Sequence, residues 1–308
     1  MKLFRSVLIS VLTVLALSSC GSTDSSLDSS ASSAAEAVSS IAESSSEAAA
    51  ESTAESITQT ETASIAESEA ESIADSKEEA KEYKSIKLMT LGDSITDGFW
   101  LEGGYRVFMC NKLEENGLSE YIDFVGSMKS GKCYDSDHEG HTAYAIEGFR
   151  EKGVGTRSGI AGKTPEWIEK FQPDVVTLMI GTNDILSLFK LDEAGSRLEA
   201  LVDSIFEKMP EGGKLFLASL PDMDANDNTY IDKDKFTVES MDTYVSEYNE
   251  KVKALADKKQ SEGKNIEFCD VHSVIGKEDL YDGVHPSEEG YQKLADYWYD
   301  IIVKYISE

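Results

Sequence analysis

The chain has 308 residues and a formal net charge of −29, because 58 acidic side chains face only 29 basic ones. Such an excess of negative charge argues against nucleic acid and against the anionic face of a membrane as charge-driven partners. It is compatible with a neutral or cationic substrate, or with a charged surface that serves solubility alone.

The first segment, residues 1–20, is predicted to be a lipoprotein signal peptide. Lys2 and Arg5 precede an apolar run of about twelve residues, which is shorter than the roughly twenty that a membrane-spanning helix needs. The run Leu-Ser-Ser-Cys over residues 17–20 resembles the lipobox of bacterial lipoproteins, which implies cleavage before Cys20 and lipidation of its sulfur. The lipid implied is a diacylglycerol, and its two acyl chains are enough to anchor a protein stably in a membrane. We therefore expect an extracytoplasmic protein that is lipid-anchored to the bacterial cell membrane; an ordinary signal peptide is the alternative.

Residues 21–84 are predicted to be a disordered linker. They consist mostly of Ser, Ala, Glu and Thr, with no Trp, Phe or Pro, and such a composition buries too little apolar surface to offset the entropy of ordering. Ile57, Ile65 and Ile73 recur every eight residues, but on a helix this spacing drifts and forms no packing seam. A coil of about 60 residues spans about 45 Å. The linker is interpreted as a tether, or as a spacer without further purpose.

Residues 85–308 are predicted to form one domain in which strands and helices alternate. Apolar segments predict strands over residues 86–91, 121–125, 174–180, 214–220 and 265–271. Periodic segments predict helices over residues 105–115, 192–209, 240–259 and 287–306, and a further helix with Thr164 as its cap and Pro165 in its first turn. Strict alternation predicts an open parallel sheet with helices on both faces.

Three cysteines remain once Cys20 is assigned to the lipid, namely Cys110, Cys133 and Cys269. No Cys-x-x-Cys pair occurs, so neither a zinc site nor a redox motif is expected. Either two of the three form a disulfide, with the pair left open, or all three are buried as small apolar side chains.

Four short segments rich in polar residues follow the predicted strands, at residues 92–98, 137–144, 181–184 and 281–287. In open parallel sheets, functional residues gather where the strands end. Ester cleavage requires a nucleophile, a base, a group that orients the base, and donors for the oxyanion. Ser94 is the candidate nucleophile, His285 the base, and Asp282 the acid that orients it. Asn183 offers a side-chain N–H of the oxyanion-hole type.

These four segments resemble, in order, the conserved blocks of the SGNH (GDSL) hydrolases, and the resemblance covers residues 86–305. It implies a flavodoxin-like three-layer α/β/α sandwich with a five-stranded parallel sheet, and hydrolysis of esters with no cofactor and no metal. It also implies that Ser94 is the nucleophile and donates its backbone N–H to the oxyanion. Asn183 then supplies a second donor, and Asp282 and His285 complete the triad.

The second block departs from the family pattern. The run Glu-Gly-His-Thr-Ala-Tyr-Ala-Ile over residues 139–146 resembles the Glu-Gly-His-Ser-Gly-Trp-Thr-Ile type of acetylxylan-esterase-like members. This alignment places Ala143 where the family has a glycine whose backbone N–H is the third oxyanion donor. Ala143 is expected to serve if its φ is negative, because a backbone N–H does not require glycine. Gly140 is the alternative donor.

Several side chains near these segments are expected to have roles other than catalysis. His138 and His141 are expected at a loop rim that contacts substrate rather than at a metal. Trp100, Tyr105 and Tyr144 are expected in the core rather than against a sugar. Further expectations are that Asp93 and Asp97 hydrogen-bond the turn around Ser94, that Asp184 ties its loop to its neighbours, that His272 is structural, and that residues 153–162, with Arg157, form a lip over the site.

The expected function is hydrolysis of carboxylic esters, with acetyl groups on a polysaccharide such as xylan as the substrate. The partners are then an acylated carbohydrate or another small ester, and the membrane through the N-terminal lipid alone. A lysophospholipase or thioesterase with the same triad is one alternative. The other is a non-catalytic, carbohydrate-binding lipoprotein at the cell surface.

Overall fold

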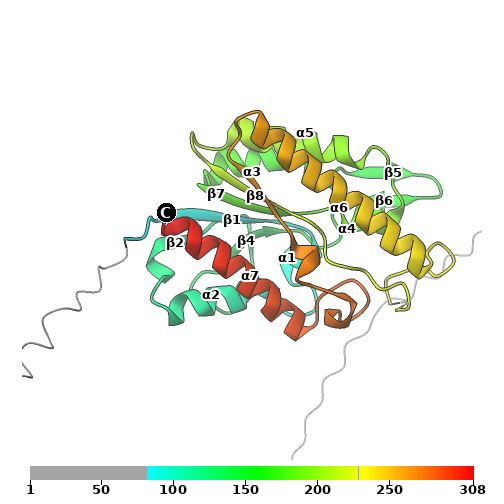
Figure 1. Ribbon diagram of the computed structural model, residues 1–308, viewed down its shortest axis with the longest axis horizontal. Coiled ribbons are helices and arrows are strands. Elements are labelled where there is room, and N and C mark those ends of the chain that lie inside the picture. The colour runs from blue at the N-terminus through cyan, green and yellow to red at the C-terminus, as the bar shows by residue number, and fades with distance from the viewer. Residues whose placement is uncertain (1–81, 228) are drawn as a thin grey trace, which may run out of the picture. The chain divides into compact units, whose positions relative to one another are not determined.

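The computed structural model describes residues 82–227 and 229–308 (Figure 1). The predicted signal peptide, Cys20 and residues 21–81 of the predicted linker lie outside the described residues. At the start of the described part, the Tyr83 ring packs against the Tyr121 ring and the Lys84 N–H donates to the Ile306 carbonyl at 2.8 Å. Within the described part, no helix is both long and apolar enough to cross a membrane.

A mostly parallel sheet forms the centre of the domain. Its strands follow the order β3-β4-β1-β7-β8-β9, and β2 also pairs with β1. All neighbours pair in parallel except β3 and β4. The strands are β1 (Ile86–Gly92), β2 (Ile122–Phe124), β3 (Met128–Lys129), β4 (Asp137–Gly140), β7 (Val175–Met179), β8 (Lys214–Ala218) and β9 (Ile266–Cys269).

The predicted fold class is confirmed, but the predicted number of strands is wrong. All five predicted strands are present, and the sheet gains β3 and β4 to become seven-stranded. The sequence of β4, Asp-His-Glu-Gly, has no apolar alternation that could predict a strand. It pairs with the last two residues of β1, beyond the point where β2 ends its own pairing with that strand. The two segments thus share one edge of β1.

Helices cover both faces of the sheet, as the alternation predicted (Figure 1). One face carries α2 (Gly104–Glu115) and α7 (Glu288–Ile306), which pack on each other; the other carries α3 (Thr164–Phe171), α5 (Ala194–Lys208) and α6 (Val238–Ser261). In α7 the buried positions recur at helical spacing, as in Tyr291, Leu294, Trp298 and Ile302. The Ser287 side chain caps α7 by accepting from the Gly290 N–H at 3.1 Å.

The start of α3 differs from the prediction. Lys163, and not Thr164, is its N-cap residue, and Pro165 lies in the first turn as expected. Thr164 is the first residue inside the helix, and its hydroxyl donates back to the Ile160 carbonyl at 3.0 Å. Elements without a predicted counterpart are α1 (Ser94–Asp97), α4 (Thr182–Ser187), the hairpin of β5 (Phe149–Glu151) and β6 (Gly155–Arg157), and the 3₁₀ turns η1 (Ser119–Tyr121), η2 (Val271–Ser273) and η3 (Lys277–Asp279).

A disulfide joins Cys110 of α2 to Cys133 in the segment between β3 and β4, with a Cα–Cα distance of 6.0 Å. Cys269 at the end of β9 is a buried free thiol, and burial raises the pKa of this thiol to about 12. One of the two interpretations left open by the sequence is therefore realised, since a pair forms and the third cysteine is buried. The bond closes a separation of 23 residues, for which chain entropy predicts a stabilisation of about 3 kcal/mol.

Candidate active site

Ser94 lies in a sharp turn between the end of β1 and the first turn of α1. Gly92 makes this turn sterically feasible, because a Cβ at its position would lie 2.3 Å from the Thr96 hydroxyl and 2.5 Å from the Met179 carbonyl oxygen. The Asp93 side chain then caps α1 by accepting from the Ile95 N–H at 3.1 Å, which confirms its predicted role in the turn. The result is a serine at the carboxyl end of a central strand, as the sequence predicted.

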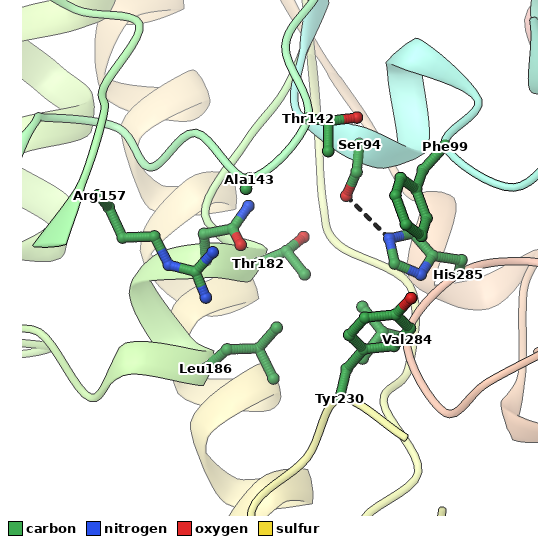
Figure 2. Close-up of a pocket in the computed structure, with 11 residues that line it drawn as sticks. Ser94, Phe99, Thr142, Ala143, Arg157, Thr182, Leu186, Tyr230, Val284 and His285 are labelled. Carbon is green, nitrogen blue, oxygen red and sulfur yellow. Dashed lines mark hydrogen bonds between the residues drawn. The ribbon is translucent and has the colours of Figure 1, made fainter. Parts of the chain in front are cut away.

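Three side chains from two distant segments form a continuous hydrogen-bonded chain. The Ser94 Oγ is 2.9 Å from the His285 Nε2, and the His285 Nδ1 is 2.8 Å from the Asp282 Oδ2. Figure 2 shows Ser94 and His285 turned toward one another across the end of the sheet. All three side chains are buried, with exposed fractions of 3–5%. This is the arrangement in which a histidine can take a proton from a serine while a carboxylate holds the ring.

The turn over residues 282–285 keeps the carboxylate of Asp282 in place. The Asp282 Oδ1 accepts from the backbone N–H groups of His285 at 2.8 Å and of Val284 at 3.1 Å. Burial alone would raise the pKa of Asp282, but the hydrogen bonds from the His285 side chain and from these N–H groups outweigh it and lower the pKa. Gly283 permits the turn, since its φ is +81° and a Cβ would lie 2.8 Å from the Asp224 carbonyl oxygen.

Asn183 lies in the first turn of α4 and is 4% exposed. Its Nδ2 donates one hydrogen bond to the Tyr144 carbonyl at 2.9 Å. A side-chain amide carries two N–H groups, so this bond orients the amide and leaves its second N–H for a ligand. Gly181, directly before α4, has a φ of +130° and packs against the Tyr248 ring, 2.4 Å from where a Cβ would stand. The start of α4 is therefore held closely against the core.

The second block holds the two candidate donors, Ala143 and Gly140, in different surroundings. Ala143 has a φ of +66°, so the condition of a negative φ set for this donor from the sequence is not met. The conformation is left-handed, which costs a residue with a Cβ about 1–2 kcal/mol and explains why glycine suits this position. Gly140 lies buried in β4 and donates its N–H to the His138 Nδ1 at 3.1 Å. Ala143 lines the cavity beside Ser94, and no backbone acceptor in the described part of the chain takes its N–H.

Hydrogen bonds tie the second block to the first and third blocks. The Thr142 hydroxyl donates to the Asp97 carboxylate, so Asp97 reaches across to block two instead of closing its own turn. The Asp184 carboxylate accepts from the Ile146 N–H and from the Arg197 guanidinium, each at 2.9 Å. The predicted tying role of Asp184 is therefore confirmed. The residues on both sides of Ala143 are anchored, which is how a strained φ between them can persist.

The expectation that His138 and His141 contact substrate is wrong, because both rings are buried and bonded within the protein. The His138 Nε2 lies 2.9 Å from the Ser130 Oγ, and burial lowers the pKa of His138 to about 3. The His141 Nε2 lies 2.7 Å from a Glu139 carboxylate oxygen, and its ring stacks on Trp167. Across residues 82–227 and 229–308, no three His, Cys, Asp or Glu side chains gather as a metal site would require.

A cavity of about 170 Å³ opens beside the serine and histidine (Figure 2). It brings together four of the predicted site residues, Ser94, Ala143, Asn183 and His285, while Asp282 lies behind the histidine. Of the predicted lip over residues 153–162, the first part belongs to the β5–β6 hairpin, and Arg157 at the end of β6 lines the cavity. The remaining lining residues are Phe99, Thr142, Thr182, Leu186, Tyr230 and Val284.

The aromatic side chains at the cavity are not those that the sequence singled out. Tyr105 is buried in the core, as expected, and Trp100 stacks on Tyr281 with ring centroids 4.2 Å apart. The cavity is instead lined by Phe99 and Tyr230, which are 45% and 47% exposed and lie 5.1 Å and 5.4 Å from the His285 ring. Phe99 directly follows the first block, a signal that sequence reasoning passed over. No sequence pattern marks Tyr230.

Comparison with known proteins shows which family and which relatives this chain resembles. Residues 88–298 match the model of the family described as GDSL-like Lipase/Acylhydrolase. A multidomain esterase of Ruminococcus flavefaciens is 36% identical over 240 residues, or 72% of this chain, and this chain spans 29% of its length.

Two solved structures extend the likeness to the fold. A Clostridium thermocellum family 3 carbohydrate esterase shares 31% identity at a TM-score of 0.55, with 72% of this chain and 100% of that chain covered. A family 3 carbohydrate esterase from Talaromyces cellulolyticus, at 22% identity and a TM-score of 0.57, has a similar fold; 72% of this chain and 98% of that chain are covered.

Proposed function

Because this chain belongs to the GDSL-like lipase/acylhydrolase family, an ester-hydrolase family, we propose that it is a serine esterase that removes acetyl groups from a polysaccharide such as xylan. The observation that supports this proposal most is the hydrogen-bonded chain from Ser94 through His285 to Asp282. A serine hydroxyl is a weak nucleophile until a neighbouring base takes its proton. Here the base, His285, lies at hydrogen-bond distance from Ser94, and both residues line a cavity.

In the proposed mechanism the Ser94 Oγ attacks the acyl carbon while the His285 Nε2 takes the hydroxyl proton. The Asp282 carboxylate keeps the opposite ring nitrogen protonated and stabilises the imidazolium that forms. The leaving alcohol receives the proton back from His285, and an acetyl group remains on Ser94. Water, deprotonated by the same histidine, then attacks this acyl-enzyme; the bond from the acyl carbon to the Ser94 Oγ breaks, His285 returns the proton to Oγ, and acetate is released.

The negative oxygen that forms during both attacks needs donors that are already in position. We assign these to the backbone N–H groups of Ser94 and Ala143 and to the second N–H of the Asn183 amide. The Tyr144 carbonyl orients the Asn183 amide, so little reorganisation is needed when the charge develops. One such donor contributes about 3 kcal/mol of transition-state stabilisation.

The choice of a short acyl group rests on the cavity and on the relatives. A cavity of about 170 Å³ with hydroxyl, amide and guanidinium groups in its wall suits an acetyl group better than a long alkyl chain. The relative with 31% identity whose whole length is covered is a carbohydrate esterase. Exposed rings at the cavity, Phe99 and Tyr230, offer apolar faces against which a sugar ring can pack.

The test is acetate release from acetylated xylan and from p-nitrophenyl esters of increasing acyl length. We expect activity to peak at acetyl and to be abolished in Ser94→Ala; near wild-type activity in this variant would sink the proposal. A preference for acyl chains beyond about eight carbons would instead favour the lysophospholipase or thioesterase. If a serine-directed fluorophosphonate does not label the purified protein, the non-catalytic carbohydrate binder is favoured.

We further propose that the protein is anchored outside the cytoplasm by a lipid on Cys20, with the linker predicted over residues 21–84 as the tether. The support is the lipobox-like sequence around Cys20 and the short apolar run before it. Cell fractionation tests the proposal. The wild-type protein is expected in the membrane fraction and Cys20→Ala in the soluble fraction, and equal fractionation of the two would refute lipid anchoring.

A further inference from the structure

The side chains that line the cavity do not share the negative charge of the chain as a whole. Acidic residues outnumber basic ones by 58 to 29 in the sequence, yet no carboxylate is among the side chains that line the cavity. Its wall contains one guanidinium, that of Arg157, and one imidazole, that of His285. Because His285 is neutral when it acts as the base, the one formal charge among the described lining side chains is the positive charge of Arg157.

Among the described arginines that are at least half-buried, Arg157 alone has terminal nitrogens that bond no acceptor of the protein. Its Nε donates to the Ser187 hydroxyl at 3.3 Å, and within the described residues its two terminal nitrogens have no acceptor and no ion pair. Arg197, by contrast, bonds the Asp184 carboxylate and two backbone carbonyls. Arg106 bonds two backbone carbonyls and the Ser130 hydroxyl. Within the described residues, Arg106 and Arg197 each bond acceptors of the protein through a terminal guanidinium nitrogen, whereas the terminal nitrogens of Arg157 bond none.

The environment of Arg157 leaves its guanidinium accessible at the cavity. The side chain is half-buried, and burial lowers its pKa, an effect that the Asp184 carboxylate partly offsets. Neither terminal nitrogen is among the fully buried polar atoms that lack a partner, so a ligand that enters the cavity can reach both. The Ser187 bond holds the planar group in place, so its two terminal nitrogens are free to bind a carboxylate in a bidentate manner.

Arg157 lies across the cavity from its aromatic side chains. Figure 2 shows Arg157 reaching in from the side opposite His285, Phe99 and Tyr230, with Ala143 on one flank and Leu186 on the other. An ester bound with its acyl carbon at Ser94 can rest its sugar against Phe99 and Tyr230. Substituents on the far side of that sugar, or on its neighbour, then come within reach of the guanidinium.

We propose that Arg157 binds a carboxylate of the substrate, so that the preferred substrates are acetylated glycans containing uronic acids. The proposal rests on the proposed esterase function and refines it. The overall charge of the chain opposes anionic molecules at long range, but salt screens that field within about 8 Å at physiological ionic strength. The cavity lining, at contact distance, then decides which charge is preferred.

The test compares acetate release from O-acetylated galacturonan oligomers with release from the same oligomers after methyl esterification of their carboxyl groups. Methyl esterification removes the charge and leaves the acetyl esters in place, and only acetate is measured. For the wild type we expect kcat/KM to be roughly 10- to 100-fold higher on the free carboxylates, the range that a charged hydrogen bond supports. In Arg157→Gln this ratio is expected to approach one, and in Arg157→Lys to be intermediate, because the charge remains but the planar fork is lost.

Arg150→Gln is the matched control. Arg150 lies exposed on the paired strand of the same hairpin and does not line the cavity, so its replacement changes the same net charge without touching the site. Its substrate ratio is expected to equal that of the wild type, whereas an equal collapse in both variants would overturn a specific role for Arg157.

Acetylated xylo-oligosaccharides, which carry no carboxylate, separate the two proposals. Acetate release from them, with a wild-type ratio near one on the galacturonan pair or a ratio that persists in Arg157→Gln, overturns the carboxylate proposal and leaves the esterase function standing. Absence of acetate release from every substrate overturns both.

Discussion

Replacing Ala143 with glycine tests the strained backbone beside Ser94. The φ of +66° costs alanine about 1–2 kcal/mol, and glycine adopts the same conformation without that cost. Glycine also gains freedom in the unfolded chain, which opposes the stabilisation by about 0.4–1 kcal/mol. The net expectation is a gain of about 0.5–1 kcal/mol in the free energy of unfolding. For a domain of this size that gain corresponds to a rise in Tm of about 1–4 °C.

The assay is urea or thermal unfolding of Ala143→Gly and the wild type, with kcat/KM on an acetyl ester measured in parallel. The N–H of residue 143 keeps its position, so the variant should retain activity. Ala161→Gly is the control, because Ala161 has no positive φ and its N–H bonds the Ile146 carbonyl. It should lose about 0.5–1 kcal/mol of stability. A loss of similar size in Ala143→Gly would refute the left-handed conformation.

Three further predictions concern donors, buried charge and the disulfide. Asn183→Ala should lower kcat on acetyl esters 10²- to 10³-fold with little change in KM; a loss confined to KM would contradict its role as an oxyanion donor. Burial raises the pKa of Asp93 from 3.8 to about 6, so its contribution to stability is fully present below pH 4 and is lost as pH rises through 6. In Asp93→Asn, the free energy of unfolding measured in urea should therefore depend less on pH between pH 4 and 7 than it does in the wild type. The variant should also be more stable than the wild type at pH 7, by up to about 3 kcal/mol. The same pH dependence in both proteins would show that Asp93 is not the titrating group. Cys133→Ser should lower the free energy of unfolding by about 3 kcal/mol, and a reducing agent should have the same effect on the wild type but none on the variant.

Side chains that follow strands were the most predictable part of the site. Ser94 and His285 lie 191 residues apart in the chain, yet each follows a strand of a parallel sheet. The carboxyl ends of parallel strands meet at one edge, so alternation of strands and helices was enough to bring them together. Asn183 was predictable for the same reason.

Conformation and local pairing were less predictable. Nothing in the run Thr-Ala-Tyr reveals that Ala143 takes a positive φ, because that angle is imposed by anchors elsewhere, at Asp97 and Asp184. The polar strand β4 exists because β1 offers it unpaired backbone groups beyond the end of β2. Pairing of this kind depends on a neighbour distant in the chain and leaves no local periodicity.

The sequence by itself determined the class of fold, the order of its elements and the residues of the proposed triad. These follow from hydrophobic periodicity and from the rule that parallel strands end at one edge, and both are properties of the chain alone. Only the tertiary structure decided that Cys110 pairs with Cys133, that Phe99 and Tyr230 face Arg157 across the cavity, and that His138 and His141 turn inward. Each of these depends on which distant side chains compete for the same space and the same hydrogen bonds, and that competition is settled only when the layers pack.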